Sequence, residues 1–203
     1  MIKIALSPAE IHEALHIAER RYERHRGNRH ARYRNLPHTH LHGALGEISF
    51  REWLRREKLP YRAPCLDENE ALSLPDFLCG HHSDDLSIGI EVKTWDTRHW
   101  QKWGRCISVE QLPSLRKKGV HIIVWATVAL ERGPASRSWQ AIKEHLRACH
   151  SLRTTLWGWH RIEEVETWGP PKPTGPEGNE VLNYQAPDAG RCLFELRGLL
   201  KGS

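Results

Sequence analysis

The residues best suited to chemistry lie in one stretch of the chain, residues 71 to 95. Asp76 follows a proline in an apolar run, and Glu91 and Lys93 stand two positions apart in the next apolar run. Side chains alternate across a strand, so Glu91 and Lys93 project from one face while Val92 points into a core. Mg²⁺ commonly takes one or two carboxylates, with water and substrate phosphate as further ligands. A nearby ammonium can orient an attacking water or stabilise a charged transition state.

The element that must position these residues is a β-hairpin, because two apolar runs flank a short loop of Gly and polar residues. The expected register pairs Cys79 with Leu86 across the loop. In that register Asp76 falls opposite Gly89, with Glu91 as its diagonal neighbour, within reach of a shared ion. Gly89 would then leave the space between the two carboxylates open. An ordinary Glu–Lys pair on a surface hairpin is the alternative interpretation.

Pro75-Asp76 followed by Glu91-Val92-Lys93 resembles the active-site signature of the PD-(D/E)XK nuclease superfamily. The resemblance covers roughly residues 38 to 130. It implies an α/β fold with a restriction-endonuclease-like core, in which helices flank a mixed central β-sheet. It also implies hydrolysis of DNA phosphodiester bonds with Mg²⁺, Mn²⁺ being the alternative cation. Asp76 and Glu91 would bind the metal, and Lys93 would assist the attacking water or the charged transition state.

A helix expected over residues 39 to 59 carries Glu47 on an apolar line. A carboxylate there is costly unless something pairs with it, and a metal or Lys93 would do so. In the resembled family the helix before the hairpin often supplies such a glutamate, and Gly46-Glu47 matches that position. Glu47 is therefore expected to complete the catalytic and metal-binding set. The alternative is a glutamate stabilised by the helix dipole.

Gln111 is the last candidate for the catalytic site. It stands near the start of a helix expected from residue 107 to 118, with Gly119 as its stop. The resembled family often has a glutamine or similar polar residue near this position. Ser108 to Gln111 is equally a capping box, in which the two residues satisfy the backbone of the first turn. Both interpretations stay open.

Basic residues are concentrated in two segments of a chain with 30 Lys and Arg against 25 Asp and Glu, a formal net charge of +5. This bias favours polyanionic partners. A helical arm over about residues 8 to 36 becomes rich in arginine, and a basic–aromatic loop over residues 94 to 105 follows the hairpin. Such segments can clamp phosphates and stack on bases, or simply be a solvated helix end and a packed lid. The residues expected to contact DNA are Arg24, Arg26, Arg29, Arg32, Arg98, Lys102 and Arg105.

The rest of the chain is expected to complete a single domain over residues 1–203. Residues 120 to 130 form a nearly continuous apolar run, typical of a strand at the centre of a covered sheet. A helix should begin near Ser138, and residues 155–159 and 162–168 should form later strands or a hairpin. The Pro- and Gly-rich residues 169–180 predict a loop. An edge strand near 181–184 and a closing segment over 192–200 should follow.

Composition narrows the class of protein. Five Cys, with no zinc-type C-x-x-C pair, fit a reducing compartment, and no apolar run approaches the length of a membrane span. His38, His40 and His42 would scatter around a helix, which disfavours a zinc module. We therefore expect a soluble cytoplasmic DNA endonuclease of the restriction or mobile-element defence type, with no membrane partner. A Holliday-junction resolvase or repair and recombination nuclease is the enzymatic alternative, and a non-catalytic nucleic-acid-binding protein is the alternative of another class. The resemblance also suggests a homodimer.

Overall fold

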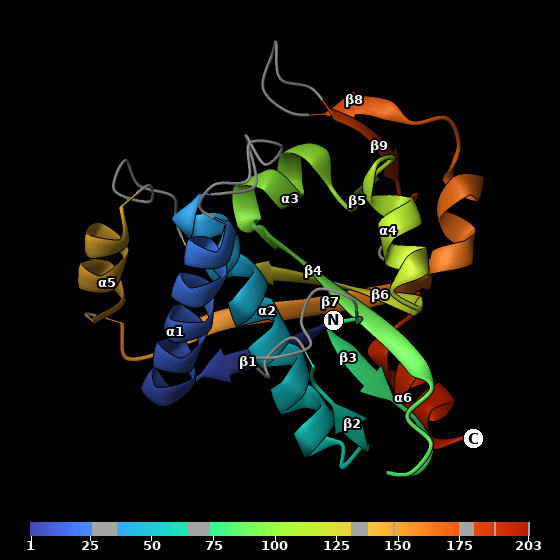
Figure 1. The fold of residues 1–203 in the computed structure, drawn as a ribbon, viewed down its shortest axis with the longest axis horizontal. Coiled ribbons are helices and arrows are strands. Elements are labelled where there is room, and N and C mark those ends of the chain that lie inside the picture. The colour runs from blue at the N-terminus through green and yellow to red at the C-terminus, as the bar shows by residue number, and fades with distance from the viewer. Residues whose placement is uncertain are drawn as a thin grey trace.

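A mixed β-sheet runs through the centre of the molecule (Figure 1). The computed structural model describes residues 1–25, 36–64, 74–130, 138–147, 149–174, 181–188 and 190–202. Within them, six strands pair in the order β1-β7-β6-β4-β3-β2. The central pair β4 and β6 is parallel, and the other neighbours are antiparallel. The strands are β1 (Ile2–Leu6), β2 (Tyr61–Arg62), β3 (Phe77–Cys79), β4 (Ile88–Asp96), β6 (Val120–Val128) and β7 (Leu152–Arg161).

The two faces of this sheet are covered by different elements. Ile122 and Val124 of β6 belong to the larger core, which they share with α1 (Pro8–His25), α2 (Pro37–Arg56), α5 (Trp139–Arg147) and α6 (Leu193–Lys201). Ile123 and Trp125 belong to a smaller core with α4 (Gln111–Lys117) and the 3-10 helix η2 (Ile162–Trp168). Alternate residues of a strand face opposite sides, so β6 is buried on both. The expected mixed sheet flanked by helices is therefore confirmed.

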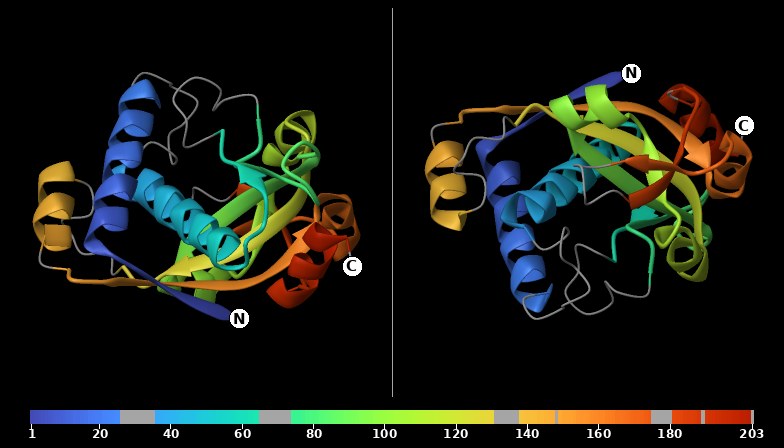
Figure 2. Two further views of the ribbon diagram at one scale, coloured as in Figure 1. Left: turned by 90° about the horizontal axis from the view of Figure 1, so that it is seen from below. Right: turned by 90° about the horizontal axis from the view of Figure 1, so that it is seen from above.

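The turned views show how the helices are arranged. In them α5 lies on the outer side of α1, and α2 lies between α1 and the strands (Figure 2). Helix α4 and the 3-10 helix η2 lie toward the other end of the molecule, as Figure 1 also shows. None of the helices that the structure describes has the length and apolar character needed to cross a membrane.

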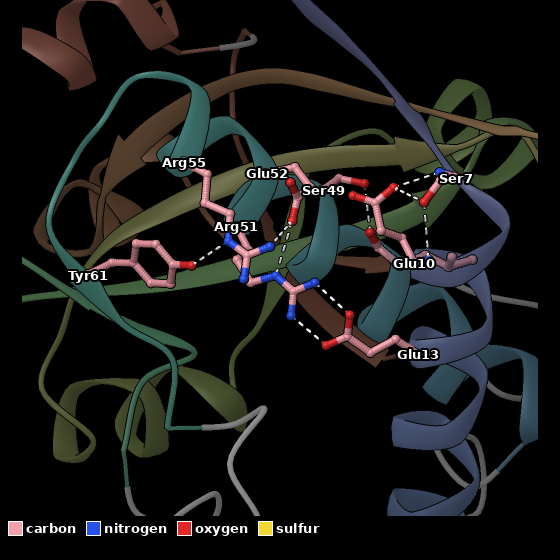
Figure 3. A network of polar contacts seen from close by, with 9 residues as sticks. Ser7, Glu10, Glu13, Ser49, Arg51, Glu52, Arg55 and Tyr61 are labelled. Atoms are coloured by element: carbon pink, nitrogen blue, oxygen red, sulfur yellow. Dashed lines mark hydrogen bonds and ion pairs between the residues drawn. The ribbon is translucent and has the colours of Figure 1, made fainter.

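Ion pairs and caps fix the helical layer on the sheet (Figure 3). Helix α1 begins with a capping box, in which the Ser7 backbone N–H donates to the Glu10 carboxylate at 2.6 Å and the Glu10 backbone N–H donates to the Ser7 hydroxyl at 3.4 Å. Arg51 of α2 donates through both terminal nitrogens to Glu13 of α1, at 2.5 and 2.6 Å. Arg55 donates to the hydroxyl of Tyr61, at 3.0 Å, which ties α2 to β2.

A second, smaller sheet was not expected. In the described residues, β5 (Cys106–Ser108), β9 (Val181–Gln185) and β8 (Lys172–Thr174) pair in the order β5-β9-β8. Strand β8 lies inside residues 169–180, which were predicted to be a loop. Its pairing with β9 brings together segments that carry little apolar periodicity of their own, so local sequence did not reveal it.

Three further predictions about elements were wrong or incomplete. Residues 94–105 were expected to be a loop, yet β4 continues to Asp96 and α3 (Thr97–Trp103) follows it at once. Residues 162–168 were expected to form a strand and instead form η2, with Ile162 and Val165 buried at spacing three. That spacing suits a 3-10 helix, whose side chains repeat every three residues. Strand β1, which pairs with β7, was not foreseen.

Candidate active site

The hairpin that carries the candidate residues forms, but its register differs from the expected one. Cys79 pairs with Ile88, not Leu86, and Phe77 pairs with Ile90. Continuing the ladder by one residue sets Asp76 directly across from Glu91. A shift of two residues leaves every side chain on its original face, so the hydrophobic pattern cannot distinguish the two registers.

Gly89 has a different role from the one expected. A Cβ added to Gly89 would lie 2.0 Å from the carbonyl oxygen of Gly119, just before β6. The missing side chain therefore permits close approach of two chain segments. It does not create a space between the carboxylates.

Asp76 lies where β3 and β4 separate. The ladder ends at the pair of Phe77 and Ile90, and beyond it the carboxylate oxygen Oδ2 of Asp76 accepts a hydrogen bond from the Val92 backbone N–H, at 2.8 Å. The side chain thus supplies the acceptor that a neighbouring strand would otherwise offer. This bond fixes Asp76 against the strand that carries Glu91 and Lys93.

The surroundings of Asp76 favour its protonated form. Burial raises the pKa of Asp76 well above its ordinary value, and the negative charges of Glu91 and Glu47 raise it further. The hydrogen bond from Val92 and the charge of Lys93 act in the opposite direction but do not prevail. A carboxylate crowded by like charges is one that a cation would relieve.

The two carboxylate oxygens of Glu91 have different surroundings. Lys93 Nζ lies 2.5 Å from Glu91 Oε1, so the expected placement of both side chains on one face is confirmed. Val92, between them, belongs to the larger core. The other oxygen, Glu91 Oε2, is buried and has no hydrogen-bond partner in the part of the chain that the structure describes. Leaving a buried acceptor unpaired costs about 1–3 kcal/mol, more when it is charged, so such atoms call for an explanation.

Glu47 is held by an arginine that the sequence analysis did not assign to the site. Arg21 Nη1 donates to Glu47 Oε1 at 2.7 Å, and Arg21 Nη2 donates to Oε2 at 2.6 Å. The expected partner was a metal or Lys93. A usable signal existed, because Arg21 stands three residues after Ala18 on the buried stripe of α1. Arg21 also falls within the helical arm of residues 8 to 36, whose arginines were expected to contact DNA.

The expected set of three carboxylate ligands is not assembled. Among the described residues, no three His, Cys, Asp or Glu side chains converge closely enough to hold a metal ion. Glu47 is close enough to Asp76 for its charge to act there, but both of its oxygens bind Arg21. What the hairpin offers is a pair of carboxylates, Asp76 and Glu91. A pair still fits Mg²⁺, which is often held by one or two carboxylates.

Gln111 is the first residue of α4. Its backbone N–H donates to the hydroxyl of Ser108 at 3.2 Å, which is one of the two bonds of the expected capping box, although the N-cap residue of α4 is Glu110. A catalytic role for Gln111 stays a prediction.

Helix α3 carries the basic–aromatic residues directly beyond the site strand. Its cap is Asp96, whose Oδ1 accepts from the His99 backbone N–H at 2.9 Å. Arg98 and Lys102 are exposed, as a role in contacting DNA requires. Arg105 follows the helix and is only half-buried. Arg24 is exposed near the end of α1, whereas Arg26, Arg29 and Arg32 lie outside the described residues.

Comparison with known proteins does not assign the chain to a family. No family model, no curated protein and no solved structure matches it.

Proposed function

We propose that the protein is a divalent-cation-dependent DNA endonuclease of the PD-(D/E)XK type, with Asp76, Glu91 and Lys93 as its catalytic residues. One observation carries the proposal. Glu91 Oε2 is a buried acceptor with no hydrogen-bond partner among the described residues, on the strand to which Asp76 is hydrogen-bonded. Burial, and then the charges of Glu91 and Glu47, raise the pKa of Asp76, so its ionised form would be stabilised by a hard cation.

Asp76 and Glu91 would hold the cation. When bound, Mg²⁺ or Mn²⁺ would supply Lewis-acid polarisation of a phosphoryl oxygen and activation of water. Asp76 must give up its proton to serve as a ligand. Its Oδ2 bond to the Val92 N–H keeps the carboxylate oriented along the strand while that proton leaves.

Lys93 is the cationic side chain of the candidate site. Its ammonium has three donors, of which one is directed to Glu91 Oε1 at 2.5 Å. The remaining donors suit an attacking water or a phosphate oxygen that gains charge in the transition state. Lys93 lies 18 % exposed, so a substrate can reach it while much of its solvation is already removed.

A cleavage assay tests the proposal. Supercoiled, linear and branched DNA would be incubated with the wild-type protein in Mg²⁺ or in EDTA, and the product ends mapped. We expect cleavage that requires Mg²⁺ and is abolished by Asp76→Asn. Glu13→Gln, which removes a carboxylate paired with Arg51 elsewhere in the helical layer, is the control and should cleave normally. Absence of cleavage on all three substrates, or cleavage by Asp76→Asn at the wild-type rate, would refute the assignment. The preferred substrate separates a restriction-type enzyme from a junction or repair nuclease.

A further inference from the structure

An arginine lies over a tryptophan ring in two places within the described residues, and only one of these two arginines is paired with a carboxylate. Arg191 lies 5.0 Å from the centre of the Trp159 ring, and Arg105 lies 5.2 Å from the centre of the Trp100 ring. Arg191 also donates to both oxygens of Glu164, at 3.0 and 2.5 Å. Among the described residues, Arg105 forms no such ion pair with a carboxylate.

Arg105 has unused donors. Its Nε is buried without a hydrogen-bond partner, and its guanidinium forms no ion pair within the part of the chain that the structure describes. The charge of Asp188 acts on Arg105 from nearby, but burial prevails and lowers the pKa of Arg105. A guanidinium that is partly desolvated and lacks an acceptor is suited to bind an anion.

The residues that position Arg105 are held by stacking and hydrogen bonds. Trp100 stacks on Trp157 with ring centres 5.2 Å apart and ring planes at 21°. Trp157 in turn donates to the Thr127 hydroxyl at 3.0 Å. The backbone carbonyl of Arg105 accepts from the Ala186 N–H at 2.9 Å, which fixes its position beside β9. Such preorganisation reduces the entropy lost when a ligand binds.

Arg105 also lies on the side of the molecule that carries the candidate site. The next residue, Cys106, begins β5, and the Lys93 ammonium is close enough for its charge to act on the Cys106 thiol. Lys102 and Arg98, both exposed, precede Arg105 on α3. The same short segment therefore joins the strand of Lys93 to a cationic surface.

We propose that Arg105 binds a phosphate of the DNA backbone other than the one that is hydrolysed. The Nε of Arg105 is buried, so the terminal N–H groups at the outer edge of the stacked guanidinium are the donors that match two phosphate oxygens. The identification of the anion as a DNA phosphate rests on the proposed function. A free phosphate ion presents the same oxygens, so the test must separate the two sources.

The test is DNA binding measured in EDTA, where no cleavage occurs, over a series of salt concentrations. The probe is a labelled duplex oligonucleotide, with a single strand of the same sequence in parallel. We expect Arg105→Gln to bind roughly ten- to a hundredfold more weakly and to reduce the log–log salt slope by about 0.9, the value for one phosphate contact. Arg105→Lys should keep most of the slope and recover only part of the affinity, because it retains charge but not the planar fork.

Arg191→Gln is the matched control. It removes the same charge from the same kind of tryptophan stack, but its arginine is already paired with Glu164. We expect Arg191→Gln to lower the melting temperature and leave DNA binding unchanged. Arg105→Gln should show the opposite pattern, with a melting temperature equal to or above wild type.

Three results would overturn the inference. The first is wild-type affinity and slope for Arg105→Gln, and the second is no DNA binding by the wild-type protein. The third is thermal stabilisation of wild type by inorganic phosphate, absent in Arg105→Gln, without any change in DNA binding, which would indicate a free-anion site. Arg105-dependent binding without Mg²⁺-dependent cleavage would reject the proposed function and keep this site. Mg²⁺-dependent cleavage with DNA binding that is independent of Arg105 would keep the proposed function and reject the Arg105 site.

Discussion

Asp76 is stabilised in its protonated form by the fold, and this has a consequence for the pH dependence of stability. Its pKa is raised by burial and by the charges of Glu91 and Glu47. Between the ordinary aspartate value and the raised value, the folded protein binds this proton more tightly than the unfolded chain does. The stability that the proton contributes is present at low pH and is lost as the pH rises through the raised pKa.

We predict that Asp76→Asn stabilises the protein in EDTA at neutral pH. Asparagine retains an oxygen that can accept from the Val92 N–H and removes one of several crowded negative charges. Thermal melts across pH in EDTA measure this. Wild type should lose stability relative to the variant as the pH rises through the raised pKa. Parallel curves for the two proteins would mean that Asp76 is not crowded by its neighbours.

Lys93 allows a separate test of catalysis. Lys93→Met keeps much of the apolar stem and removes the ammonium. We predict a loss of about 10²–10³-fold in turnover, typical of one donor to a developing charge, with DNA affinity changed only a few-fold. Cleavage kinetics and Mg²⁺-dependent DNA binding, measured on one preparation, decide this.

The alternative for Lys93 is a partner of Glu91 and nothing more. Lys93→Met would then lower stability, because it leaves the buried Glu91 carboxylate uncompensated, while turnover of the folded protein would stay near wild type. That outcome would make the match of Glu91-Val92-Lys93 to the nuclease signature accidental.

Helices α1 and α2 are joined by two bidentate arginine–glutamate bridges within their described residues. Arg21 of α1 binds Glu47 of α2, and Arg51 of α2 binds Glu13 of α1. Both bridges join an arginine to a glutamate, but the arginine belongs to α1 in the first and to α2 in the second. Only the first includes a carboxylate whose charge acts on Asp76. They therefore form a natural pair of variant and control.

We predict that Arg21→Gln and Arg51→Gln both destabilise the fold, by about 1–3 kcal/mol, with Arg51→Gln nearer the lower limit. Glu13 is 42 % exposed, so solvent screens its ion pair. Only Arg21→Gln should reduce cleavage, because it releases Glu47 beside the site. Melting temperatures and cleavage rates measure the two effects. Equal loss of activity in both variants would show that the bridges matter only for stability.

The ion pair of Arg51 and Glu13 should affect how the stability of the protein changes at acid pH. Arg51 lowers the pKa of Glu13. The contribution of this pair is therefore present above the ordinary glutamate pKa and is lost as the pH falls through the lowered value. Arg51→Gln should lose less stability than wild type over that window.

Elements with a strong local pattern were predicted well from the sequence. The helical arm expected from about residue 8 matches the start of α1 at Pro8, and the apolar run of β6 predicted a strand buried on both faces. Strand β1 and the sheet of β5, β9 and β8 depend on pairing between distant segments. Short runs of this kind carry no local signal strong enough to specify a partner.

The candidate site was predictable to a similar extent. Alternation alone placed Glu91 and Lys93 on one face of β4, and the ion pair between them confirms it. The register beside Asp76 was wrong by two residues, because such a shift preserves the face. The pairing of Glu47 with Arg21 depends on how two helices cross, which neither helix encodes by itself.

The proposed function of the molecule requires that Asp76 and Glu91 together hold a divalent cation. Calorimetric titration with Mn²⁺ at mildly alkaline pH, on wild type, Glu91→Gln and Glu13→Gln, tests it without DNA or catalysis. We predict saturable binding to wild type and Glu13→Gln, its loss in Glu91→Gln, and weaker wild-type binding as Asp76 regains its proton at lower pH. Equal Mn²⁺ binding by wild type and Glu91→Gln, or none by wild type, would contradict the proposed cation site.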